Sequence, residues 1–280
     1  MITATVSVQD VLNYDYARAR KLLLPAERSV NLALIGCGGT GSWLAPTVAR
    51  VGRLLMEKFD KEVNIVFCDP DRVEEKNIYR QNFCAAEIGE NKAETLAYRY
   101  GLAWGLEIQA SPQAFARDIF RASYRSTTVL IGCVDTPEAR RSIAKAGQWW
   151  LDCGNHKNSG QVLLGNGKER PDDPFSLPGY CSWLPSPALQ RPELLVDEPT
   201  GPVSAANLSC ADLALLDSQS LSINQRIAAE AGDFLIRMLI TKDLQRMAAY
   251  IDLAAGSARS VYITEENILG GRDGHSGDDQ

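Results

Sequence analysis

The sequence predicts an α/β protein with a doubly wound sheet, mostly parallel in its N-terminal half and mixed in a C-terminal extension. Apolar runs of strand length alternate with stretches of helical spacing, which is the pattern of successive βαβ units. The most informative run, residues 31–36, ends in a glycine-rich turn and leads into an expected helix at 41–57. Further strands are expected at 63–68, 108–110, 127–133, 149–153, 162–164 and 261–264, and further helices at 114–123, 137–146 and 222–240.

The glycine-rich turn is the first candidate binding element. Gly36, Gly38 and Gly41 fit the G-x-G-x-x-G spacing of a Rossmann-like nucleotide-binding turn. Glycines let the backbone approach a ligand, and the following helix offers free N–H groups to phosphate. The alternative is a tight turn that binds nothing. Asp69, at the end of the second strand, has the place of a ribose-binding acid, and Asp71 lies beside it. The candidate contacts in the turn are Gly36, Gly38, Gly39 and Gly41.

A polar segment after the second strand is unusual for a dinucleotide-dependent dehydrogenase. Asn77, Arg80 and Gln81 follow one another at helical spacing, so a single turn can present all three to one side. Lys92 then begins the next expected helix. Each residue alone reads as a solvated surface group, but together they are typical of side chains that bind a triphosphate.

Asp135 and two cysteines complete the candidate residues. Asp135 follows an expected strand at the edge where open α/β sheets bind ligands, so it is a candidate Mg²⁺ ligand. The alternative is that it caps the next helix. Cys210 opens an expected helix after a proline-rich crossover at 166–206, where a thiol has a lowered pKa and becomes a better nucleophile. A buried structural cysteine is the alternative, and Cys181 is the second candidate nucleophile.

Composition narrows the class of protein. The 280 residues carry a net charge of −6 without a dense basic tract, so no general affinity for nucleic acid or membrane surfaces is expected. The N-terminus lacks the features of a signal peptide, and the seven cysteines are an odd number, which favours a reducing, cytoplasmic location. None of them forms a Cys-x-x-Cys pair, so a zinc site is not expected.

These residues resemble the ThiF/MoeB family of adenylating enzymes, which are related to ubiquitin-activating enzymes. The resemblance covers roughly residues 28–165 well and 205–240 more loosely. It rests on the glycine turn, Asp69-Pro70-Asp71, Asn77-x-x-Arg80-Gln81, Lys92 and Cys133-Val134-Asp135-x-x-x-x-Arg140. Later pieces are similar to the ThiF-family member of bacterial PRTRC gene clusters, namely Asp152-Cys153-Gly154, Gly160-Gln161-Val162, Ser209-Cys210, Asp217-x-Gln219-Ser220 and Asn224-Gln225.

The resemblance implies a function. The family binds MgATP, usually as a homodimer, and adenylates the C-terminal carboxylate of a small ubiquitin-like or sulfur-carrier protein. Some members then form a thioester on a cysteine. Carried over, the glycine turn holds the phosphates and Asp69 the ribose. The triphosphate is contacted by Asn77, Arg80, Gln81 and Lys92, Mg²⁺ is held by Asp135, and the catalytic residues are Arg80, Lys92, Asp135 and Cys210.

The resemblance also implies one ThiF-like adenylation domain over residues 1–280, in which an arginine at 18 or 20 could complete a partner subunit's site. One departure from the family is the missing pair of Cys-x-x-Cys motifs that hold zinc in many members. The expected parts are a helical lead-in (1–27), a nucleotide-binding half (28–165), the crossover (166–206), C-terminal helices and a strand (207–268) and a disordered tail (269–280).

Two other functions fit parts of the sequence. An NAD-dependent oxidoreductase would use the glycine turn and Asp69, but it leaves the polar segment after Asp69 without a role. A non-catalytic scaffold could keep the fold and dock a ubiquitin-like protein without chemistry. The nearly complete set of phosphate-binding residues argues against this scaffold.

Overall fold

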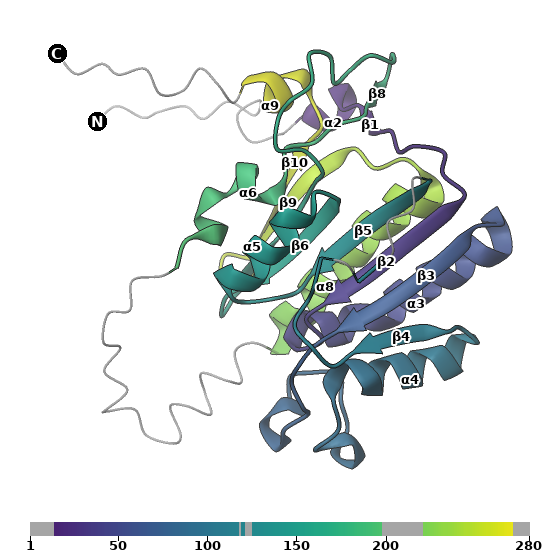
Figure 1. The fold of residues 1–280 in the computed structure, drawn as a ribbon. Helices are drawn as coiled ribbons and strands as arrows, with labels where there is room; N and C mark the ends of the chain where they lie inside the picture. The colour runs from purple at the N-terminus through teal and green to yellow at the C-terminus, as the bar shows by residue number, and fades with distance from the viewer. Residues whose placement is uncertain (1–13, 118, 121–124, 198–220, 271–280) are drawn as a thin grey trace, which may run out of the picture.

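The computed structural model describes residues 14–117, 119–120, 125–197 and 221–270. Its centre is an eight-stranded sheet in the order β10-β9-β7-β6-β5-β2-β3-β4, with helices on both faces (Figure 1). The five strands from β6 to β4 run parallel, and β7, β9 and β10 continue the sheet antiparallel. The expected Rossmann-like, doubly wound sheet with a mixed C-terminal extension is therefore confirmed.

The register of the strands explains where a site can form. Ile35, the last residue of β2, lies opposite Cys68 at the end of β3 and Gly132 at the end of β5. The segments that leave these strands consequently start at one edge of the sheet. The strands are β2 (Ser29–Ile35), β3 (Glu62–Cys68), β4 (Ile108–Ser111), β5 (Ser126–Gly132), β6 (Trp149–Asn155), β7 (Ser159–Gly165), β9 (Arg246–Asp252) and β10 (Ser257–Tyr262).

Helices cover the two faces unequally. On one face lie α3 (Gly39–Phe59), α4 (Lys92–Trp104) and α8 (Leu221–Ile236), which continues as the π-helix η5 (Arg237–Thr241). On the other lie α5 (Pro137–Ala146) and the short α6 (Pro187–Gln190). The short elements are α2 (Asp15–Arg18), η1 (Glu75–Asn77), η2 (Ala85–Glu87), β8 (Tyr180–Cys181), η3 (Pro192–Leu195) and α9 (Glu265–Leu269).

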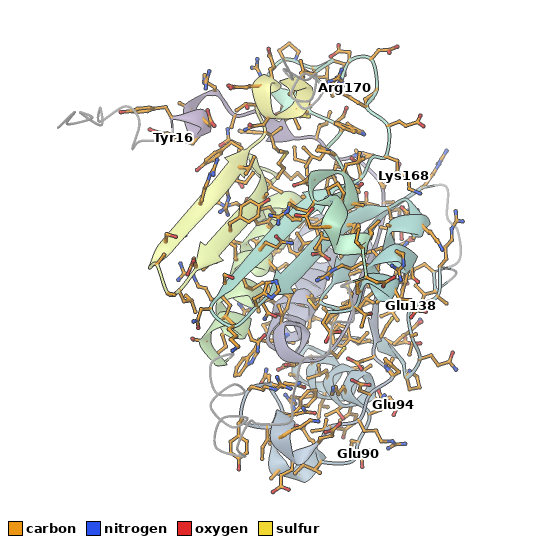
Figure 2. All side chains as sticks on the ribbon, turned by 90° about the vertical axis from the view of Figure 1, so that its left-hand side faces the viewer. Tyr16, Glu90, Glu94, Glu138, Lys168 and Arg170 are labelled. Atoms are coloured by element: carbon orange, nitrogen blue, oxygen red, sulfur yellow. The ribbon has the colours of Figure 1, made fainter. Side chains whose placement is uncertain are left out.

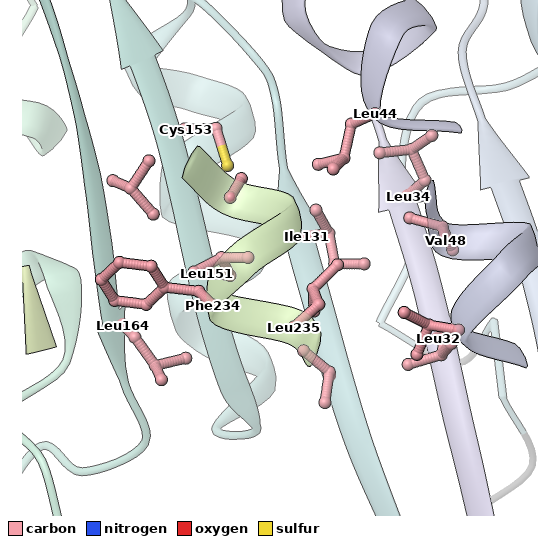
Figure 3. Close-up of a cluster of buried hydrophobic side chains, with 14 of the residues drawn as sticks. Leu32, Leu34, Leu44, Val48, Ile131, Leu151, Cys153, Leu164, Phe234 and Leu235 are labelled. Carbon is pink, nitrogen blue, oxygen red and sulfur yellow. The ribbon is translucent and has the colours of Figure 1, made fainter. Parts of the chain in front are cut away.

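The core follows the two-residue period of the strands. In β2, Leu32 and Leu34 point to the face of the sheet that α3, α4 and α8 cover. Figure 3 shows them beside Leu44 and Val48 of α3. Their neighbours Ala33 and Ile35 point to the α5 face. Because both faces of β2 are covered, residues 32–35 of this strand are all apolar, as in a buried parallel strand.

In its described part, residues 14–27, the expected helical lead-in is helical only over a short stretch. Within the described residues only α2 is helical there, and Lys21–Leu22 forms the strand β1, which pairs in parallel with β8. Leu22 is buried, and its N–H donates to Leu244 O over 2.7 Å, so this segment gains its hydrogen bonds from distant chain rather than from a helix.

A second expectation, a helix at 114–123, is also wrong for its described residues, which form turns and loops. The proline-rich crossover expected at 166–206 is described over residues 166–197, where the short elements β8, α6 and η3 form. The expected disordered tail lies almost wholly outside the described residues.

The polar segment that follows β3 lies at one end of the folded molecule. Figure 2 shows Glu90 and Glu94 at one end of the molecule and Arg170 at the other. Glu90 and Glu94 flank the start of α4, so that end belongs to the polar segment that follows β3. None of the helices in the described part of the chain is long and apolar enough to cross a membrane.

Candidate nucleotide-binding site

The glycine turn between β2 and α3 leaves no room for a side chain at Gly36 or Gly41. Gly36 has a φ of +86°, and a Cβ built on it would lie 2.6 Å from Cys133 O. A Cβ on Gly41 would lie only 1.9 Å from Gly36 O. The N-cap of α3 is Gly38, and no side chain caps it. The first N–H groups of a 21-residue helix are thus left without a side-chain acceptor, as a phosphate-binding turn requires.

Asp69 connects this turn to the end of β3. Its Oδ2 accepts from the N–H of Cys37 over 2.6 Å, and its Oδ1 accepts from the N–H of Asp71 over 2.8 Å. Burial raises the pKa of Asp69, although the two backbone hydrogen bonds act in the opposite direction. The acid expected to bind ribose therefore also fixes the shape of the glycine turn.

Lys92 is buried beside the same turn. Its side chain is only 8% exposed, and its Nζ lies 3.0 Å from Oδ2 of the exposed Asp71. The N-cap of α4 is Asn91, which accepts from Glu94 N and donates from Nδ2 to Asp69 O over 2.9 Å. Sequence reasoning did not single out Asn91, although an asparagine directly before a helix is a recognisable capping signal. This cap places the Lys92 ammonium group next to the Asp69–Asp71 turn.

Asn77, Arg80 and Gln81 do form a single turn. Gln81 N donates to Asn77 O over 2.8 Å, and both side chains are buried. The Asn77 side chain faces its own turn, where Oδ1 accepts from Glu74 N. Gln81 faces the glycine turn, since its Nε2 lies 3.8 Å from a Cβ built on Gly38. Among the described residues, Gln81 Oε1 has no hydrogen-bond partner, so a ligand with a hydroxyl donor, such as ribose, fits there.

Helix α3 holds this polar turn through a backbone carbonyl group that lacks its usual hydrogen-bond donor within the helix. Pro46 lies inside α3 and has no N–H, so the carbonyl of Ser42 lacks its usual helical donor. Asn82 Nδ2 donates to Ser42 O over 3.2 Å, and Asn82 N donates to Ser42 Oγ over 2.9 Å. Trp43 Nε1 also donates to Arg80 O over 3.2 Å. The segment that carries Arg80 is thereby fixed directly against the start of α3.

Asp135 lies exposed at the carboxyl edge of β5. Thr136, and not Asp135, caps α5, since its Oγ1 accepts from Ala139 N over 3.3 Å. The Asp135 carboxylate is therefore not needed as a helix cap. Within the described residues no cluster of three metal-ligating side chains occurs. Mg²⁺ commonly binds through one carboxylate and the phosphates of a nucleotide, so a single exposed aspartate at this edge fits that ion.

A buried ion pair lies behind Asp135. Asp152 is fully buried in the middle of β6, and its Oδ1 lies 3.2 Å from Nε of Arg140. Burial raises the pKa of Asp152 to about 6, because the cost of removing its charge from water exceeds the attraction of Arg140. Arg140 Nη1 lies 3.5 Å from the carbonyl of Asp135. The pair thus supports the backbone that presents the candidate metal ligand.

The candidate nucleophiles are not equally placed. Cys210 lies outside the described residues. Cys181 is fully buried in β8, where its Sγ donates to Trp183 O over 3.0 Å and burial raises its pKa. The arginines considered for a partner's site are engaged within the chain. Arg18 pairs with Asp15, and Arg20 pairs with Glu265.

A polar cluster on the far side of the glycine turn was missed by sequence reasoning. Thr40 and Asn224 are buried, and Asn155 reaches them from the end of β6. Asn155 Nδ2 donates to Thr40 Oγ1 over 3.2 Å and also to Asn224 Oδ1. Asn224 belongs to the pieces of the sequence that are similar to the ThiF-family member of PRTRC gene clusters, but no local pattern relates it to residue 40. The cluster joins α3, β6 and α8 around the turn.

Comparison with known proteins identifies the family of the chain. The family model described as ThiF family matches residues 19–172, which is more than half of the chain. The chain belongs to the ThiF family. No curated protein matches it at a significant level. The matched range includes every candidate residue from Gly36 to Asp135, so these residues occupy the family's own segment.

Solved structures share the fold of this ThiF-family chain. The structure of E. coli MccB with ATP matches at 13% identity and a TM-score of 0.53, covering 86% of this chain and 65% of MccB. The structure of E. coli MccB with AMPCPP and MccA matches at 14% identity and a TM-score of 0.52, covering 85% and 64%. The chain thus spans just under two thirds of the length of these MccB structures.

Proposed function

We propose that the chain uses ATP to adenylate the C-terminal carboxylate of a small ubiquitin-like or sulfur-carrier protein. The observation that carries the proposal is the uncapped N-terminus of α3, with the buried Lys92 and Gln81 beside it, in a chain of the ThiF family. The MccB structures with ATP and with MccA support a nucleotide and a peptide or protein substrate. The proposed partner is therefore a polypeptide that presents its C-terminus.

The reaction needs few groups from the protein. A carboxylate oxygen attacks the α-phosphorus, a new P–O bond forms, and the bond to the pyrophosphate oxygen breaks. The nucleophile is already ionised at neutral pH, so no general base is required. Arg80 and Lys92 neutralise charge on the phosphates, and the N–H groups of α3 hold them in place. Bound Mg²⁺, held by Asp135, supplies further neutralisation of the leaving pyrophosphate.

Two finer steps belong to the same proposal. A thioester on Cys210 is proposed to follow adenylation, since the other candidate, Cys181, is buried with a raised pKa. A homodimer is proposed in which Arg18 or Arg20 contributes to the neighbouring site. Either arginine would first have to leave its ion pair with Asp15 or Glu265, and such exposed pairs are weak.

Calorimetry tests the nucleotide first. The purified chain is titrated with ATP with and without Mg²⁺, and with NADH as the control ligand. Binding of ATP that tightens with Mg²⁺, and loses this gain in Asp135→Ala, is the expected result. Binding of NADH alone would instead support an oxidoreductase. Pyrophosphate exchange with a panel of carrier proteins then tests adenylation, and exchange with none of them would overturn the proposed substrate class.

A further inference from the structure

The first turn of α8 places a carboxamide directly on the phosphate turn. Asn224 is 4% exposed, and a Cβ built on Gly39 would lie 2.6 Å from its Oδ1 and 3.0 Å from its Nδ2. Any side chain at position 39 would therefore displace Asn224. The glycine at 39 is explained by this contact with α8, and not by a special backbone conformation.

Two donors fix which way the carboxamide of Asn224 is turned. Its Oδ1 accepts from the Thr40 hydroxyl over 3.4 Å and from Nδ2 of Asn155. In this arrangement the amide oxygen of Asn224 is the atom that faces Thr40 and Asn155. The Nδ2 group is therefore the end that remains available, and it makes no hydrogen bond to any other residue in the described part of the chain.

The available donors lie where phosphate binding is proposed. Asn224 Nδ2 is next to Gly39, the first residue of α3, whose N-terminus no side chain caps. On the Gly38 side of the same turn, the buried Gln81 Oε1 has no partner among the described residues, which independently indicates a ligand at this turn. Polar groups buried without partners are rare unless a ligand or water satisfies them.

We propose that Asn224 is a phosphate-binding residue, whose Nδ2 donates to a phosphate oxygen of the nucleotide at the N-terminus of α3. This inference rests on the proposed function. A carboxamide adds donors without adding another cation beside Lys92. It also makes nucleotide binding depend on the docking of α8, because Asn224 is held by Thr40 from one side and Asn155 from the other.

The test compares Asn224→Asp with the unaltered chain. The aspartate keeps the shape and can still accept from Thr40 and Asn155, but it replaces the donors with a negative charge. Affinity for ATP is expected to fall about tenfold to a hundredfold, as for the loss of a hydrogen bond to a charged group. Affinity for adenosine, measured by competition with a fluorescent adenosine analogue, is expected to stay the same. A residue with a merely structural role would change both affinities together.

The matched control is Asn31→Asp. Asn31 is also 4% exposed, and its Nδ2 donates to Ser126 Oγ and Thr128 Oγ1 in the half of the sheet away from the turn. The Asn31→Asp variant is expected to leave the ratio of the affinity for ATP to the affinity for adenosine unchanged. Should Asn224→Asp fail to fold, Asn224→Ala is tested for the same selective loss of ATP affinity.

Two outcomes would overturn the role of Asn224. One is ATP affinity within twofold of the unaltered chain in the folded variants. The other is an equal loss of affinity for ATP and adenosine. If the unaltered chain itself binds no ATP, the proposed function fails instead, so the two failures are distinguishable.

Discussion

Replacing the buried Asp152 by asparagine is expected to stabilise the protein at neutral pH. Burial raises the pKa of Asp152 from 3.8 to about 6 even though Arg140 lies 3.2 Å away. A folded-state pKa above the unfolded value means that the folded chain binds this proton more tightly. The contribution of Asp152 to the free energy of unfolding is therefore most favourable below pH 3.8 and decreases until the pH passes 6. The pKa displacement corresponds to about 3 kcal/mol.

Urea denaturation at several pH values between about 4 and about 7.5 measures this effect. Protonated aspartic acid and asparagine are both neutral and similar in shape, so Asp152→Asn and the unaltered chain should be almost equally stable at the acidic end. The variant should become more stable by about 3 kcal/mol at neutral pH, because residue 152 then carries no charge that burial would penalise. The control is Asp197→Asn, which removes an exposed carboxylate paired with Arg141 at 3.1 Å and should show no such change.

The reasoning would be refuted by a stability difference between Asp152→Asn and the unaltered chain that does not change with pH. It would also be refuted if the unaltered chain were the more stable at neutral pH. Either result would mean that Arg140 compensates fully for the burial of the Asp152 charge.

Two further predictions concern the proposed site. Gly41→Ala is expected to abolish measurable ATP binding in calorimetry and to lower the free energy of unfolding by about 1–3 kcal/mol. The reason is that the alanine Cβ would lie 1.9 Å from Gly36 O. An ATP affinity close to that of the unaltered chain would show that the turn is not as tight as described. Arg80→Ala is expected to slow pyrophosphate exchange by at least about 100-fold. The matched control Arg53→Ala, which removes an exposed arginine paired with Glu57 on α3, should leave exchange unchanged, and equal rates in the two variants would contradict the role of Arg80.

Local patterns were sufficient to predict the central elements of the fold. The helix expected at 137–146 is α5 with the same bounds, because Pro137 suits a first turn and Gly147, at a φ of +67°, ends it. The strand expected at 63–68 is β3 except for one residue. In contrast, β1 has only two residues, and its partner β8 lies far along the chain, so no periodicity could indicate it.

The candidate site shows the same division between local and distant information. Asp69, Lys92 and Gln81 follow one another closely and could be recognised by type and spacing. Asp69 and Gln81 lie against the glycine turn and Lys92 lies against Asp71, while the roles of all three toward ATP remain predictions. Asn224 touches Thr40 across 184 positions of sequence, and nothing local marks it as part of the site. Such a partner is found only when packing brings two helices together.

Pro46 has a consequence for any attempt to make this protein more robust. A proline inside a helix costs roughly 3 kcal/mol relative to alanine, so Pro46→Ala is an obvious choice for thermostabilisation. Yet the alanine N–H would compete with Asn82 for the Ser42 carbonyl, which now anchors the segment carrying Arg80. The expected result is a chain with a higher melting temperature in which Arg80 is held less firmly, so a more stable helix and a fixed position of Arg80 oppose each other at this one position.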